Sequence, residues 1–272
     1  VYGNKIYVAV DQENTVEVID KTTFKRIKQI KTIDLLGANE GKSPRHVAAS
    51  NGKVYVSTYG GVVAAIDTLS FTLAAKYKVG NYPEGMLIIN NNLFVANSNY
   101  AKGGGNISIV NLDNGSVTTR DVKGINNPQS FFVGNDRQLY VLDWATYDAS
   151  FTPLSENNLR RINADFATSE KIAEANYVAS LKGIFVIINA PYGKEASYTL
   201  YSPAENMKKD WNLTDKVEYP CGISVDPVRG YTFIMSYPKS KDGNFADYNS
   251  DGYVYQYDTS GSKNKDYKTG VG

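Results

Sequence analysis

A short strand-like segment built around an aromatic residue recurs six times along the chain. The copies span residues 5–10, 53–57, 92–96, 138–142, 183–187 and 230–234. Equivalent positions, starting from residue 6, are separated by 48, 39, 46, 45 and 47 residues. A period of roughly 40 to 50 residues is typical of β-propellers, in which each repeat folds into one blade. The spacing therefore predicts an all-β protein whose six repeats are six propeller blades.

Each copy is flanked by patterns that predict three further strands. A Pro-led apolar run precedes most copies, as in 44–49, 83–88, 128–133 and 220–225, and predicts an inner strand buried on both faces. Polar turns such as 50–52 and 90–91 supply the Asn and Gly that a tight antiparallel hairpin needs. An outer strand with alternating charge follows, for example 25–30 and 76–79. Four antiparallel strands make one blade.

The third strand of most repeats ends on an acid or amide, whose side-chain oxygen can bond the backbone of the turn that follows. The residues in question are Asp20, Asp67, Asn111, Asn163 and Asp258. The fifth repeat departs from the others, because Ala173 stands where they have Pro and Tyr201 replaces the terminal acid.

Composition restricts the partners of the chain. Lys and Arg number 29 against 28 Asp and Glu, so no global field favours nucleic acid or an acidic membrane. The single cysteine, Cys221, excludes an internal disulfide and a multi-cysteine zinc site. No Pro/Ser-rich linker interrupts the repeat, so residues 1–272 are expected to form one domain.

The phase of the repeat suggests that the chain is a piece of a longer protein. The first repeat begins at its second strand, and the chain stops where a further inner strand is expected. Closing a propeller ring needs that strand. We therefore expect a longer parent protein that has at least one more blade, the ring-closing strand and any export signal.

The amino-acid sequences of the repeats also resemble those of a known family. The segments VYGNKIYV (1–8) with NTVEVIDK (14–21), YPEGM (82–86) with LFVANS (93–98), and GISVDP (222–227) resemble the YncE-like seven-bladed propellers of the Bacteroidetes, which are surface lipoproteins. Some members capture cobalamin beside an outer-membrane transporter. The resemblance implies a cell-surface or outer-membrane-anchored protein, with the periplasm as the alternative. It also implies a seven-bladed ring with one further N-terminal blade ahead of Val1, a lipid anchor outside this chain and an outer-membrane protein as partner.

Long connections between the second and third strands are candidates for recognition. They cover 97–106, 143–158 and 237–252, and irregular segments of this length tend to be functional or mobile. Tyr and Trp in such loops suit binding surfaces, because a rigid ring offers a large contact area at low entropy cost. The predicted ligand-binding rings here and in the fifth repeat are Tyr100, Trp144, Tyr147, Tyr192, Tyr237 and Tyr248. The alternative is that these rings, together with Phe151 and Phe245, pack their own loops.

Polar residues at the starts of the inner strands form a second candidate set. Arg45, His46, Glu84, Gln129 and Glu174 could line the channel mouth and bind a ligand's amides, phosphate or carboxylates. Equally, they could be solvated rim residues. His46 is the only histidine, and no G-x-S-x-G elbow accompanies it, so the sequence gives no nucleophilic triad.

One segment matches half of a calcium-binding loop. Asp247, Asn249 and Asp251 place side-chain oxygens on alternate residues before Gly252, and Asp258 falls at the twelfth position. A plain Asn/Asp/Gly turn is the alternative, because Asp258 is also the ordinary strand-ending acid of its repeat. Calcium is thus the one cofactor that the sequence leaves open, and no catalytic residue is assigned.

These observations favour a non-enzymatic surface protein that captures a small ligand or docks a partner protein. The resemblance implies cobalamin or another corrinoid as the ligand. Two alternatives stay open. One is a propeller enzyme, either a lactonase-like hydrolase or a quinone-dependent dehydrogenase, although the convergent acids and histidines of metal-assisted chemistry are missing. The other is a structural surface-layer protein.

Overall fold

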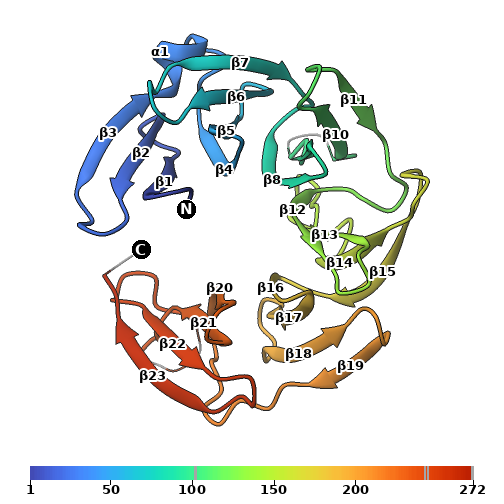
Figure 1. The fold of residues 1–272 in the computed structure, drawn as a ribbon. Coiled ribbons are helices and arrows are strands. Elements are labelled where there is room, and N and C mark those ends of the chain that lie inside the picture. The colour runs from blue at the N-terminus through green and yellow to red at the C-terminus, as the bar shows by residue number, and fades with distance from the viewer. Residues whose placement is uncertain (101–102, 242, 244, 271–272) are drawn as a thin grey trace. The chain divides into compact units, whose positions relative to one another are not determined.

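The computed structural model of the chain describes residues 1–100, 103–241, 243 and 245–270. Its strands form six sheets in chain order, one of three strands and five of four (Figure 1). The predicted all-β architecture of antiparallel propeller blades is confirmed, and the described part of the chain contains no seventh blade.

Each sheet is a run of sequential strands. The first holds β1 (Lys5–Val10), β2 (Thr15–Asp20) and β3 (Arg26–Lys31) and is followed by a helix that the repeat did not predict, α1 (Thr32–Leu36). The second holds β4 (Pro44–Ser50), β5 (Lys53–Thr58), β6 (Val62–Asp67) and β7 (Leu73–Lys78). The third holds β8 (Pro83–Ile89), β9 (Asn92–Asn97), β10 (Asn106–Asn111) and β11 (Val117–Arg120).

The remaining sheets keep the same order. The fourth holds β12 (Pro128–Val133), β13 (Leu139–Asp143), β14 (Asn158–Ile162) and β15 (Ser169–Glu174). The fifth holds β16 (Tyr177–Leu181), β17 (Ile184–Asn189), β18 (Ser197–Ser202) and β19 (Met207–Asp210). The sixth holds β20 (Pro220–Asp226), β21 (Tyr231–Ser236), β22 (Tyr253–Tyr257) and β23 (Lys263–Lys268).

The chain groups into two compact units. Unit 1 consists of Val1–Phe131, Asp143–Glu156 and Ile162–Glu170 and contains the first three sheets. Unit 2 consists of Phe132–Leu142, Asn157–Arg161 and Lys171–Gly272 and contains the fifth and sixth sheets. Strands of the fourth sheet are divided between the two units.

Burial corrects the expectation for the inner strands. Most residues of β4, β8 and β20 are only partly buried, whereas β5 and β9 are buried along almost their whole length. The first strand of a blade lies at the edge of its sheet and pairs on one side only, while the second strand lies between two neighbours. The prediction of strands buried on both faces was therefore wrong for the inner strand, and it describes the second strand.

In unit 1 the second strand of a blade contributes to two cores. Successive side chains of a strand point to opposite faces of the sheet. Val54 and Val56 of β5 accordingly join Val16 and Val18 of the first sheet, whereas Tyr55 joins the other core. That second core is formed by the apolar side chains Tyr55, Val63, Ala65, Leu93, Val95 and Val110. Both faces of β5 are thus covered by neighbouring blades.

The predicted hairpins between first and second strands are confirmed by the backbone. Asn51 and Gly52 have φ angles of 49° and 73°, and Asn90 and Asn91 have 47° and 60°. Two consecutive positive φ angles match the right-handed twist of a hairpin, and Asn and Gly adopt them at the lowest cost. In the fifth repeat Lys182 takes the first of these positions, with φ 53°.

The predicted turns after the third strand are also present. Asp20 Oδ1 accepts hydrogen bonds from the backbone N–H of Thr22 and Thr23 at 2.9 and 2.7 Å. The same bonds recur after Asp67 and Asn111. Asp258 Oδ1 accepts from the N–H groups of Ser260 and Ser262, two and four residues on, whereas Asn163 Nδ2 donates to Thr168 Oγ1 at 2.6 Å. In the fifth repeat Tyr201, which replaces the acid, donates its hydroxyl to Asn206 instead, at 3.1 Å.

The fifth repeat needs one correction. Ala173 and Glu174 lie in β15, the outer strand of the preceding sheet, and the inner strand β16 begins at Tyr177. The sequence aligned them with an inner-strand start because no Pro marks the true start. Glu174 accepts from Asn189 Nδ2 at 3.3 Å and is not equivalent to Arg45, Glu84 and Gln129.

Across the described ranges, the structure contains no helix that is both long and apolar enough to span a membrane.

Candidate functional site

Arg45, His46 and Glu84 come together at the starts of two inner strands in unit 1. The register of β4 against β5 shifts between Pro44 and Val47, so Arg45 and His46 lie in an irregular stretch of the ladder. Glu84 occupies the corresponding position of β8, where the register also shifts. Bulges of this kind re-aim side chains next to functional sites. Here they place Arg45 Nε 3.0 Å from Glu84 Oε2.

Glu84 is the buried centre of this polar cluster. Only 4% of its side chain is exposed. Its carboxylate accepts hydrogen bonds from Arg45 and from the hydroxyl of Tyr59, and its backbone carbonyl accepts from Ser57 Oγ at 2.8 Å. A buried carboxylate is stable only when it is paired and hydrogen-bonded, and Glu84 meets both conditions.

Two residues that the sequence did not single out complete the cluster. Asp11 Oδ2 lies 2.9 Å from Arg45 Nη1, and the Arg45 guanidinium stacks over the Tyr59 ring, 4.7 Å from its centroid. Burial, followed by the hydrogen bond to Glu84, raises the pKa of Tyr59, so that residue donates as a neutral phenol. Asp11 directly follows β1 and Tyr59 directly follows β5, at the end of the sheets where the inner strands start. The sequence predicts that both loops lie at this end, but it does not single out either side chain.

His46 is the side chain of the cluster that is most open to solvent, with 44% of its surface exposed. Its Nε2 lies 3.7 Å from Glu84 Oε2. Removal of the ring from water lowers the pKa of His46 below 6.5, Glu84 opposes this shift, and Arg45 adds to it. A depressed pKa means that the unfolded chain binds the proton more readily. Protonation of His46 therefore favours unfolding as the pH falls through 6.5.

A proton NMR titration should show this directly, because the chain has one histidine and hence one set of imidazole signals. We expect a midpoint below 6.5, a lower midpoint in Glu84→Gln, and a higher midpoint in Arg45→Gln, since the three charges interact. A midpoint that moves in neither variant would contradict the placement of His46 beside Glu84 and Arg45.

Gln129, the third predicted residue at an inner-strand start, is buried and bonds locally. Its Nε2 donates to Asn127 Oδ1 at 2.6 Å and to Asn127 O at 3.2 Å. Asp143 accepts from the backbone N–H groups of Asn126 and Asn127 at 3.0 and 2.7 Å, which fixes the turn into β12. Direct contact of Glu84 or Gln129 with a ligand stays a prediction, whereas Arg45 and His46 offer exposed surface.

In unit 1 the long loop after β13 presents its aromatic residues to solvent. Tyr147 is 54% exposed, Phe151 85% and Trp144 38%, and on the loop after β9 Tyr100 is 72% exposed. Polar bonds hold the backbone of the loop after β13. Thr146 N donates to Ser155 Oγ at 2.9 Å, and Asp148 Oδ1 accepts from Ser150 N and Thr152 N, both at 2.8 Å. The loop is therefore ordered by its polar groups, and the rings of Tyr147 and Phe151 are more than half exposed.

In unit 2 the predicted ligand-binding rings differ in their packing. Tyr192 is 88% exposed on a tight turn in which Lys194 N donates to Pro191 O. Tyr237 and Tyr248 instead pack edge to face, with ring centroids 4.7 Å apart. Tyr248 nevertheless stays 59% exposed, so ligand binding by this pair stays a prediction.

The calcium prediction gains no support from the geometry of its loop. Asp247 accepts from Asn249 N at 2.9 Å and Ser250 Oγ at 2.6 Å, as in an ordinary Asx turn, and Asp251 pairs with Lys268 at 2.9 Å. Across the residues that the structure describes, no three His, Cys, Asp or Glu side chains group closely enough to hold a metal ion. Calcium at Asp247, Asn249 and Asp251 stays a prediction.

Comparison with known proteins identifies the fold and no family. No family model matches the chain, and no curated protein matches it. One similar solved structure is a functionally unknown protein from Desulfotomaculum acetoxidans DSM 771, with a TM-score of 0.66 and 12% identity over 98% of this chain and 81% of the other. Another is the computationally designed Ika8 protein, with a TM-score of 0.60 and 10% identity over 98% of this chain and 85% of the other.

At such low identity these similarities establish the fold alone. The resemblance to YncE-like propellers stays a prediction. The sheet order and the two similar structures together identify the chain as six blades of a β-propeller.

Proposed function

We propose that this chain is a non-enzymatic binding protein that captures a small ring-bearing ligand through the loop between β13 and β14. The observation that carries the proposal is the exposure of Trp144 and Tyr147, by 38% and 54%, on a backbone that the loop's own hydrogen bonds hold in place. Rings displayed on an ordered loop lose little entropy on binding, and stacking on them suits a flat ligand.

A corrinoid is the first ligand to test. It carries a large ring system for stacking, and its peripheral amides and phosphate would suit exposed polar groups such as those of Arg45 and His46. The choice of corrinoid, a position at the cell surface and an outer-membrane partner all follow from the family resemblance and belong to the same proposal.

Replacing both rings should separate binding from stability. In Trp144→Ala/Tyr147→Ala we expect calorimetric titration with cyanocobalamin to give an affinity weaker by about tenfold or more, because aromatic anchors carry much of the energy of a binding surface. The melting temperature should fall by no more than a few degrees, since exposed side chains contribute little to stability.

Phe24→Ala is the matched control. Phe24 is 73% exposed and lies in the turn between β2 and β3, at the end of its sheet opposite to the one where the inner strands start. It should leave the affinity unchanged. Unaltered binding together with a large loss of stability in the double variant would show that the rings serve packing. Turnover of a lactone or of an alcohol with a quinone cofactor would favour the enzymatic alternative.

A further inference from the structure

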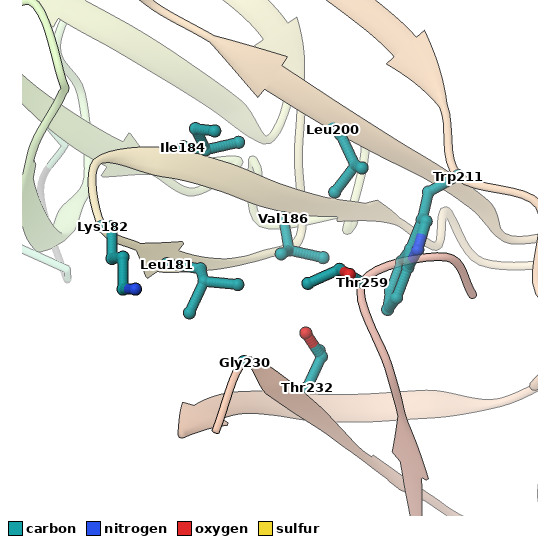
Figure 2. A pocket seen from close by; sticks show the side chains of 9 residues that line it. All are labelled: Leu181, Lys182, Ile184, Val186, Leu200, Trp211, Gly230, Thr232 and Thr259. Atoms are coloured by element: carbon teal, nitrogen blue, oxygen red, sulfur yellow. The ribbon is translucent and has the colours of Figure 1, made fainter. Parts of the chain in front are cut away.

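A second candidate site lies in unit 2, between the fifth and sixth sheets. A pocket of about 280 Å³ opens between the hairpin that joins β16 to β17 and the start of β21 (Figure 2). Its walls are mainly apolar and include Val186, Leu200 and the indole of Trp211. Small-molecule sites have this character, with apolar walls and a few polar groups that fix orientation.

Protein contacts hold the indole wall of the pocket in place. Trp211 is 4% exposed and packs edge to face on Tyr257, with ring centroids 5.8 Å apart. Val186 is 2% exposed. Figure 2 shows Trp211 at one end of the pocket and Lys182 at the opposite end. The pocket therefore has one rigid apolar end and one charged end.

A buried hydroxyl projects into the pocket between these ends. Thr232 is 2% exposed, and Figure 2 shows its oxygen pointing between Val186 and Thr259. Across the described ranges, its hydroxyl makes no hydrogen bond to a protein group. A ligand oxygen placed here would accept a hydrogen bond from this hydroxyl.

Lys182 supplies the one charge of the pocket lining. Its position in the hairpin, with φ 53°, exposes the side chain beside Leu181 at the open end. Within the part of the chain that the structure describes, no carboxylate lies within ion-pair distance of its amine. The positive charge of Lys182 thus favours a ligand that carries an anionic group. The apolar walls disfavour a ligand that is polar throughout.

We propose that this pocket binds a small monocarboxylate with an apolar body. The body lies against Val186, Leu200 and Trp211, an oxygen of the ligand hydrogen-bonds to Thr232, and the carboxylate pairs with Lys182. An apolar body alone would leave Thr232 without a partner, and a fully polar anion would gain nothing from the walls.

The fluorescence of Trp211 reports directly on the occupancy of this pocket. The chain has two tryptophans, Trp144 and Trp211, so Trp144→Phe leaves the pocket indole as the single tryptophan emitter. In this background, titration with 3-phenylpropionate should change the emission saturably. The neutral analogue 3-phenylpropanamide should bind about tenfold more weakly, because it lacks the charge that pairs with the amine.

Two variants test the polar contacts. Lys182→Gln should bring the acid and the amide to similar affinities, and Thr232→Val, which keeps the shape of the side chain, should weaken the acid by about fivefold. Lys194→Gln is the matched control: it removes an equally exposed lysine from the loop between β17 and β18 and should change neither affinity.

Three outcomes would overturn the proposal. The first is a Trp211 emission that does not change saturably with 3-phenylpropionate up to its solubility limit. The second is equal affinity for acid and amide in the protein with Lys182 present. The third is an acid affinity that survives both Lys182→Gln and Thr232→Val while thermal melts show that these variants are folded.

Discussion

Glu84→Ala is expected to lower the free energy of unfolding by about 3–5 kcal/mol, because it removes one partner of a buried ion pair. The change leaves Arg45, whose side chain is 30% exposed, with Asp11 as its remaining ion-pair partner among the described residues. It also leaves the Tyr59 hydroxyl without its acceptor. Urea unfolding followed by circular dichroism measures the loss.

Two further variants serve as comparisons for the Glu84→Ala result. Glu84→Gln keeps the shape and one acceptor oxygen and should cost less, about 1–3 kcal/mol. Glu40→Ala removes the carboxylate of an exposed pair, in which Glu40 lies 2.6 Å from Lys76 and both side chains are more than a third exposed. That loss should stay below about 1 kcal/mol. A Glu84→Ala effect no larger than that of Glu40→Ala would mean that water reaches the Glu84 carboxylate.

The second large effect is expected at Phe185 of β17. This ring is fully buried and contacts Phe132, Tyr140 and Tyr201, with ring centroids 5.8, 4.8 and 6.2 Å away. Phe185→Ala should lower the free energy of unfolding by about 3–5 kcal/mol, since the lost burial is joined by a cavity that the stiff neighbouring rings cannot fill. Urea unfolding again provides the measurement.

The control for Phe185 is an exposed ring of the same unit. Phe245 is 55% exposed, and Phe245→Ala should change stability by no more than about 0.5 kcal/mol. Phe185→Leu should lie between the two, because it retains much of the apolar volume. Similar losses for Phe185→Ala and Phe245→Ala would contradict the packing of the aromatic cluster.

The parts of the fold that depend on local chemistry could be predicted from the sequence. The hairpins follow from residues such as Asn51 and Gly52, and the turns after the third strands follow from Asp20 and Asp67, because the controlling interactions lie within a few residues. The repeat then sets the number of blades. Helix α1 was missed because its five residues are too few to show a helical period, and the start of β16 was missed because no Pro begins that strand.

The candidate site could be predicted only in part, for a related reason. Arg45 and Glu84 are 39 residues apart in the chain, and they pair because two blades present the same strand position side by side. The repeat alignment found both of them. It could not supply Asp11 and Tyr59, because their loops differ in length from blade to blade and therefore have no equivalent positions.

The repeated turn after the third strands has a consequence for behaviour in acid. Hydrogen bonds from the turn backbone hold the pKa of Asp20 and Asp67 in unit 1 below 3.8, and a hydroxyl together with backbone groups does so for Asp258 in unit 2. A depressed carboxyl pKa contributes stability that is present above 3.8 and is lost as the pH falls through the folded-state value. Because the same kind of turn occurs in both units, acid below pH 3.8 weakens a strand-ending turn in each of them.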